Sequence, residues 1–149
     1  MREAIALSEE SVRRGGGPFG AVIVRNGEVI ARGANSVTLS NDPTAHAEIA
    51  AIRGACSSLR LFKLEGCELY SSCEPCPMCL SAAYWAGIER IYYACTREDA
   101  AAAGFDDSFI YGQISLAPLQ RRIPAVNMLR GEASAAMRDW VQKEDKKPY

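Results

Sequence analysis

Two short segments constrain the fold of this chain more than any other feature of its sequence. The segment His46–Glu48 (HAE) contains the only histidine of the chain, and the segment Pro75–Cys79 (PCPMC) contains two of its six cysteines. Each segment lies where a helix is predicted to begin, and the positive end of a helix favours thiolates. Imidazole and thiolates together suit zinc. A fold that uses both segments for one metal must bring two helix N-termini together.

His46, Cys76 and Cys79 are the candidate zinc ligands. Three protein ligands leave one tetrahedral position for water, which is the arrangement of a catalytic zinc. Zinc lowers the pKa of such a water towards about 7. Glu48 lies two residues after His46 and is not needed as a ligand. We therefore predict one Zn²⁺ per chain with a bound water or hydroxide, and Glu48 as the group that takes a proton from that water and passes it on.

Two alternatives to this catalytic site remain open from the sequence alone. Cys73 stands three residues before Cys76, so Cys73, Cys76, Cys79 and His46 could form a closed structural zinc in a module without turnover. That site would give Glu48 no role. Alternatively, His46 is a core histidine and Glu48 a surface acid. We expect the remaining cysteines to be small buried hydrophobes: Cys56, Cys67 and Cys95.

The rest of the sequence predicts alternating helices and strands. Asn26-Gly27 separates two β-rich runs and predicts a hairpin, and Asp42 with Pro43 fits the start of a helix. Helices are expected at 2–13, 45–56, 72–87 and 132–143, with Gly87 as the stop of the third, and a short helix capped by Thr96 is expected to run through 100–103. Strands are expected at 21–24, 29–31, 67–70, 90–95 and 123–128. This alternation predicts a three-layer α/β/α sandwich with a mixed five-stranded sheet.

Length and charge narrow the class of protein. A chain of 149 residues predicts one domain, residues 1–149. Its 17 basic and 18 acidic residues give a net charge of −1, which argues against a nucleic acid as partner. The first ten residues contain acids where a signal peptide has an apolar run, and no run approaches the roughly 18 apolar residues of a membrane span. We expect a cytoplasmic protein that does not bind membranes.

Three stretches resemble the zinc-dependent nucleobase deaminases of the cytidine deaminase-like superfamily. They are residues 17–24 (GPFGAVIV), 41–48 (NDPTAHAE) and 72–79 (SCEPCPMC). His-x-Glu followed by Pro-Cys-x-x-Cys is the known signature of these enzymes. Residues 101–111 (AAAGFDDSFIY) resemble the corresponding segment of the guanine deaminases. The resemblance covers nearly the whole chain, including its ending at Tyr149.

The resemblance implies a reaction and roles for single residues. The reaction is the hydrolysis of guanine to xanthine and ammonia, by a hydrolase that acts on the C–N bond of a cyclic amidine in a small purine base. Glu48 would carry the protons, and Asp107 would contact the exocyclic amine and serve as a second proton shuttle. Asn35 would be the amide that recognises the base.

The resemblance also implies a pocket and an assembly. Phe19, Ala47 and Trp85 would line the pocket, and Tyr149, on a tail of about 143–149, would cover the substrate. The family forms homodimers, in some members with the C-terminal segment exchanged between subunits. Other deaminases share the metal site, so three alternatives stay open: a deaminase of another nucleobase or nucleoside, of an aminotriazine, or of adenosine in tRNA.

Overall fold

The computed structural model describes residues 1–148, which divide into two units, Met1–Asp107 and a second that begins at Ser108. The first unit contains α1 (Arg2–Arg13), β1 (Gly20–Arg25), β2 (Glu28–Ala34), α2 (Val37–Ser40), α3 (Ala47–Leu59), β3 (Cys67–Cys73), α4 (Pro77–Ala86), β4 (Arg90–Cys95) and α5 (Arg97–Ala102). The second contains α6 (Ser108–Ser115), a 3-10 turn η1 (Pro118–Gln120) and α7 (Arg130–Gln142).

One mixed sheet of four strands organises the first unit, in the order β2-β1-β3-β4. β1 is antiparallel to both β2 and β3, and β3 is parallel to β4. The predicted hairpin joins β1 to β2, with positive φ angles of 53° at Asn26 and 80° at Gly27. Two positive φ angles in succession are what a two-residue hairpin turn needs, which is why this dipeptide predicted it.

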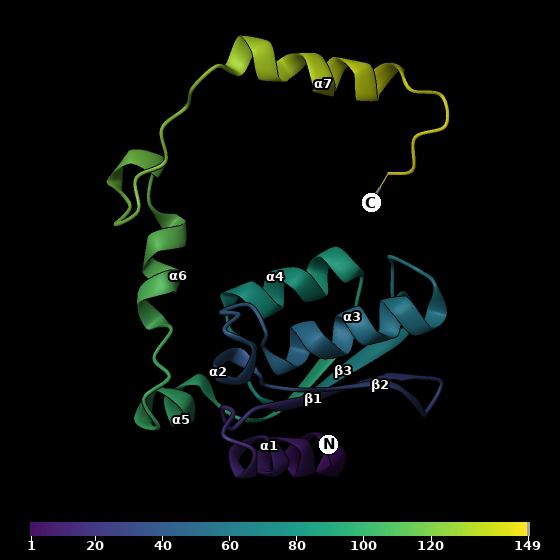
Figure 1. The fold of residues 1–149 in the computed structure, drawn as a ribbon, viewed down its shortest axis with the longest axis vertical. Helices are drawn as coiled ribbons and strands as arrows, with labels where there is room; N and C mark the ends of the chain where they lie inside the picture. The colour runs from purple at the N-terminus through teal and green to yellow at the C-terminus, as the bar shows by residue number, and fades with distance from the viewer. Residues whose placement is uncertain (149) are drawn as a thin grey trace. The chain divides into compact units, whose positions relative to one another are not determined.

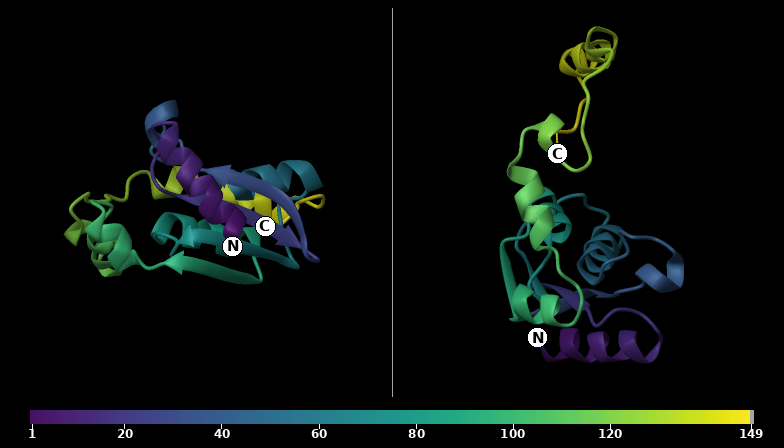
Figure 2. Two further views of the ribbon diagram at one scale, coloured as in Figure 1. Left: turned by 90° about the horizontal axis from the view of Figure 1, so that it is seen from below. Right: turned by 90° about the vertical axis from the view of Figure 1, so that its left-hand side faces the viewer.

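Helices cover both faces of the sheet. α1 lies on one face, and α3 and α4 lie on the other (Figure 1, Figure 2). The helix α3 packs so close to β2 that a Cβ atom added at Gly33 would stand 2.0 Å from the carbonyl oxygen of Ala47. The closely packed core includes Ile23, Leu64 and Leu69, each at most 1% exposed. The three-layer prediction therefore holds for this unit.

Several elements differ from the sequence predictions. The helix α4 begins at Pro77 rather than at residue 72, and α2 was not expected. The sheet has four strands rather than five, and residues 123–128 form no strand. Pro124 within that segment has no N–H to donate to a neighbouring strand, and Ile123 is exposed. The second helix begins at Ala47 rather than at residue 45. The Asp42 carboxylate instead accepts hydrogen bonds from the backbone and hydroxyl of Thr44, which holds a turn before the helix.

The second unit has a different character. None of residues 108–148 is buried, although α6 and α7 contain many apolar side chains. Neither α6 nor the 3-10 turn was expected from the sequence, whereas α7 matches the predicted final helix. Across residues 1–148, no helix combines the length and apolar character needed to cross a bilayer.

Candidate active site

The chain brings the two predicted helix starts together. His46 is the residue that precedes α3, and Cys76 is the residue that precedes α4. Both have extended backbone, with ψ of 154° and 168°, which places them at the mouths of their helices. Cys79 follows in the first turn of α4. Two helix N-termini thus converge on these three side chains, and their positive ends favour thiolate ligands.

The distances among the three side chains fit zinc. Nδ1 of His46 lies 3.6 Å from Sγ of Cys76 and 3.5 Å from Sγ of Cys79. Tetrahedral zinc with bonds of about 2.1 Å to nitrogen and 2.3 Å to sulfur separates its ligands by about 3.5–3.8 Å. Within residues 1–148, this is the one group of at least three His, Cys, Asp or Glu side chains whose ligand atoms lie this close together. The donor set therefore fits zinc with one position left for another ligand.

Cys73 does not join this group, which argues against the closed structural site. Its thiol donates to the carbonyl oxygen of Thr96 at 3.4 Å. Burial raises the pKa of Cys73 to about 11, so it stays a neutral thiol. Cys95, at the end of β4, is exposed, contrary to the expectation that it would be buried. All six cysteines are free.

The electrostatics of the cluster favour a thiolate at Cys76. Hydrogen bonds from Cys79 and from His46 lower the pKa of Cys76 to about 4. In return, the hydrogen bond with Cys76 raises the pKa of His46, and the pKa of Cys79 is raised by its hydrogen bond to Cys76 and by burial. Zinc binds deprotonated cysteines, so a site that already stabilises one thiolate is prepared for the metal.

Glu48 is a buried acid directly beside the cluster. It is 5% exposed, and its two oxygens accept hydrogen bonds from Oγ of Ser71 at 3.2 Å and from Sγ of Cys79 at 3.5 Å. Burial raises the pKa of Glu48. A buried carboxyl group beside a metal site can act as a general base and a general acid. This position excludes the alternative in which Glu48 is a surface acid.

A cavity of about 340 Å³ opens onto these groups. His46, Cys76 and Glu48 line it together with Phe19, Asn35 and Asp107. Burial, followed by the negative charge of Cys76, raises the pKa of Asp107. A cavity of this volume with a few converging polar groups is typical of a site for a small molecule.

Asn35 presents a defined hydrogen-bonding face. It is 7% exposed, and its side-chain oxygen accepts from the backbone N–H of Gly17 at 3.2 Å and of Val37 at 3.3 Å. Because the backbone groups can only donate, the carboxamide oxygen must face them. The side chain therefore offers its NH₂ group as the donor for a ligand.

Two of the expected pocket residues do not line this cavity, and a third cannot be placed. Ala47 is fully buried as the first residue of α3 and does not line it. Trp85 is 64% exposed on α4 and does not line it either. Tyr149 lies outside the described residues. Conversely, the cavity walls include residues that sequence reasoning did not single out: Glu74, Arg97 and Phe105. The ring of Phe105 meets the ring of Phe19 edge-on, with centroids 5.0 Å apart.

The chain has relatives along its full length. It is 51% identical to guanine deaminase of Bacillus subtilis over an alignment of 150 positions, which covers 100% of this chain and 96% of that protein. The X-ray structure of B. subtilis guanine deaminase superposes with a TM-score of 0.96 and covers 99% of this chain and 95% of that chain. The fold and the order of elements are therefore shared beyond the metal site.

Two more distant relatives cover different shares of the chain. The tRNA-specific adenosine deaminase of Aquifex aeolicus is 43% identical over 94 residues, covering 63% of this chain and 62% of that protein. A structure of guanine deaminase from Nitrosomonas europaea superposes with a TM-score of 0.67 at 31% identity, over 91% of this chain and 79% of that chain. The family described as cytidine and deoxycytidylate deaminase zinc-binding region matches residues 1–95. This chain belongs to that family of zinc-binding deaminases, with guanine deaminase among its full-length relatives.

Proposed function

We propose that this chain is a zinc-dependent guanine deaminase, which hydrolyses guanine to xanthine and ammonia. The observation that carries the proposal is the placement of Glu48 beside the His46, Cys76 and Cys79 cluster at the wall of one cavity. The similarity to B. subtilis guanine deaminase extends through the whole chain, whereas the similarity to the A. aeolicus tRNA deaminase covers 63% of it. The full-length match therefore favours guanine over adenosine in tRNA.

Glu48 would carry out the first proton transfer. His46, Cys76 and Cys79 would hold the zinc, which would supply Lewis-acid chemistry that makes water a better nucleophile near neutral pH. Glu48 takes a proton from the attacking water and delivers it to the ring nitrogen next to C2 of guanine. Burial raises the pKa of Glu48, which favours its protonated form more than in an exposed carboxyl group. Glu48 then moves the proton of the hydroxyl group added at C2 to the amino group. The C2–N bond breaks, ammonia leaves, and the C2=O bond of xanthine forms.

The remaining cavity residues would hold and orient the base. Asn35 donates from its NH₂ group to an acceptor on the purine ring, because its oxygen is already bonded to the backbone. Phe19 and Phe105 provide an apolar wall for the flat ring. Asp107, at the cavity wall, accepts from the exocyclic amine and serves as a second proton carrier.

A panel of ring substrates tests the proposal. Ammonia release is measured for the zinc-loaded protein with guanine, adenine, cytosine, cytidine and an aminotriazine in separate reactions. Guanine turnover far above the others supports the proposal. Turnover of another ring without guanine keeps the metal and Glu48 chemistry but overturns the substrate. One zinc per chain with no ammonia from any base would identify a zinc module without turnover.

The proposal includes a homodimer. Large apolar side chains are exposed in both units, among them Trp85 in the first and Ile123 and Met137 in the second. Exposed apolar surface on this scale marks an interaction site, and a second copy of the chain is the partner we propose. The tail of about 143–149, with Tyr149, would cover the base, on its own subunit or exchanged with the partner. A chain that stays monomeric at all concentrations in light scattering would contradict the dimer.

Free cysteines also agree with a cytoplasmic location, which is part of the proposal. All six thiols are unpaired with one another, and thiols stay reduced in the cytosol. The structure thus needs no oxidising compartment for its stability.

A further inference from the structure

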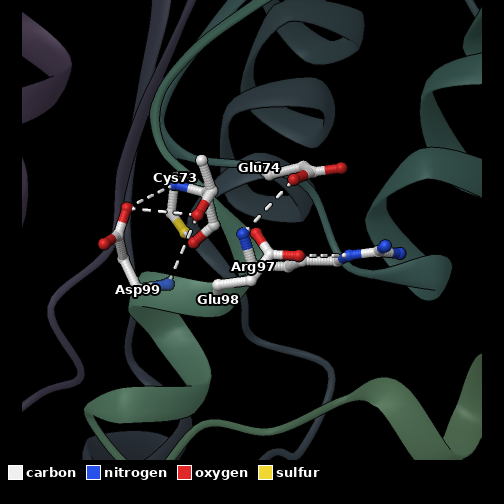
Figure 3. A network of polar contacts seen from close by, with 6 residues as sticks. Cys73, Glu74, Arg97, Glu98 and Asp99 are labelled. Carbon is white, nitrogen blue, oxygen red and sulfur yellow. Dashed lines mark hydrogen bonds and ion pairs between the residues drawn. The ribbon is translucent and has the colours of Figure 1, made fainter.

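Three hydrogen bonds at consecutive positions join the metal loop, residues Cys73–Cys76, to residues 95–97, at the end of β4 and the start of α5. Figure 3 shows the one between Glu74 and Arg97. The backbone N–H of Glu74 donates to the carbonyl oxygen of Cys95 at 2.9 Å. The thiol of Cys73 donates to the carbonyl oxygen of Thr96 at 3.4 Å. The backbone N–H of Arg97 donates to Oε2 of Glu74 at 3.2 Å. The third bond differs from the first two because it uses a carboxylate of the loop, directly before Pro75 and Cys76.

The segment held in this way is the start of α5. Arg97 is its first residue, and Thr96 and Asp99 exchange hydrogen bonds in a capping box that makes the first turn rigid. After α5, Gly104 has a φ of 93°, a left-handed conformation that turns the chain back. Phe105 and Asp107, two of the residues that line the cavity, come shortly after Gly104. A shift of α5 would therefore move this wall relative to Cys76.

We infer that Glu74 is a positioning residue that fixes the Phe105 and Asp107 wall at a set distance from the metal ligands. It acts through its hydrogen bond to Arg97 N–H and through α5, rather than by contact with the reacting atoms. The inference rests on the proposed function, because it assigns Glu74 a role in holding the same base. The geometry requires an acceptor oxygen at this position, and a neutral amide oxygen meets that requirement as well as a carboxylate.

Three variants distinguish the role of the Glu74 side chain as a hydrogen-bond acceptor from the role of its negative charge. Glu74→Gln keeps an acceptor oxygen for Arg97 N–H, and Glu74→Ala removes it. Glu98→Ala is the matched control, because Glu98 is a neighbouring carboxylate that pairs with the Arg97 side chain at 3.1 Å and does not line the cavity (Figure 3). We expect kcat/KM for guanine to fall about five- to tenfold in Glu74→Ala, as for one lost hydrogen bond, and to change less than about twofold in the other two. Zinc per chain stays at one in all three.

Two further readouts respond to positioning but not to a general loss of structure. First, we expect the Arg97 amide to exchange with solvent faster in Glu74→Ala and at the wild-type rate in Glu74→Gln. This measurement needs no substrate, so it tests the inference even if guanine turnover fails. Second, in a double-mutant cycle, Phe105→Ala should cost less in the Glu74→Ala background than in the wild type, since the wall is already displaced there.

Several results would overturn the inference. A loss in Glu74→Gln as large as in Glu74→Ala would assign the effect to the charge. Loss of zinc from Glu74→Ala would place its role in the metal loop alone. Unchanged amide exchange at Arg97, or full additivity with Phe105→Ala, would remove the link through α5. If Glu74→Ala does not fold, Glu74→Asp replaces it, because the shorter side chain keeps the charge but cannot reach Arg97 N–H without a shift. In that case wild-type activity and Arg97 exchange in Glu74→Asp would contradict the inference.

Discussion

The two units of this chain differ in whether they bury their apolar side chains. Residues 1–107 bury their apolar side chains between a sheet and helices on both of its faces, and this packing fixes the metal ligands. In residues 108–148, nothing is buried, although Ile114, Leu119 and Val126 are all large and apolar. Helices of eight and thirteen residues are marginal in water without a surface to pack on. The first unit can define a site by itself, whereas the second requires cover by another surface.

The largest effect should come from the acid in the first unit. We expect Glu48→Gln to keep one zinc per chain, because His46, Cys76 and Cys79 are unchanged, and to lower guanine turnover by about 10²–10⁴-fold, since the amide cannot carry a proton. Metal analysis and steady-state kinetics on the same preparation check this. Near-normal turnover would remove Glu48 from the mechanism.

The next effect compares one apolar side chain from each unit. Leu69 is fully buried on β3, so Leu69→Ala should lower the free energy of unfolding by about 2–5 kcal/mol at every protein concentration. Ile123 is 83% exposed, so Ile123→Ala should cost less than about 0.5 kcal/mol where the chain is monomeric. A larger cost for Ile123→Ala should appear only at concentrations at which a dimer forms. If both variants lost the same unfolding free energy in dilute protein, the contrast between a buried and an exposed unit would be wrong. Denaturant unfolding at two concentrations measures both.

Two glycine-to-alanine substitutions, one in each unit, compare a closely packed position with an open one. In Gly33→Ala, the new methyl group would stand 2.0 Å from the carbonyl oxygen of Ala47, so α3 must move away from β2. We expect a loss of stability of about 1–3 kcal/mol and weaker zinc binding, because His46 directly precedes α3. Gly112→Ala meets nothing within 4 Å in α6 and should stabilise that helix by about 0.5–1 kcal/mol. Thermal unfolding with zinc titration tests both, and a harmless Gly33→Ala would refute the close packing.

The smallest effect concerns two thiols at the end of the sheet. Cys73 and Cys95 are paired in register on β3 and β4, but Cys73 is buried and Cys95 is exposed. At pH 8 we expect iodoacetamide to alkylate Cys95 much faster than Cys73, whose pKa is raised to about 11 by burial. Because the native state favours the neutral Cys73 thiol, this stabilisation is complete below about pH 9 and is lost as the pH rises towards 11. Mass spectrometry of alkylated peptides gives the order, and faster modification of Cys73 would contradict its burial.

The turns and helix ends that the sequence predicted correctly are those that one or two neighbouring residues determine. Asn26-Gly27 demands a hairpin, Gly87 ends α4 in a left-handed conformation, and Thr96 caps α5. The fifth strand failed because the apolar run at 123–128 indicates β structure only if a partner strand exists, and the sequence does not show where partners lie. The start of α3 was misplaced because Asp42 satisfies a turn as well as it caps a helix.

The residues of the candidate site also fall into those that the sequence predicted and those that it could not. His46, Cys76, Cys79 and Glu48 were predicted from residue type and spacing, and the structure places them together. Trp85 came only from family resemblance, and the structure leaves it exposed on α4, since a pattern of residues does not tell which face of a helix meets a cavity. The role of Glu74 could not be read from sequence either. Its partner Arg97 is 23 residues away along the chain, and only the pairing of β3 with β4 brings them together.

The most direct test of the account is the conversion of guanine to xanthine by protein loaded with one zinc per chain, followed before and after removal of the metal. We predict rapid xanthine formation, its loss when the metal is chelated, and its recovery when zinc is added back. Absence of xanthine from the zinc-loaded protein, or undiminished conversion after the metal is removed, would contradict the account.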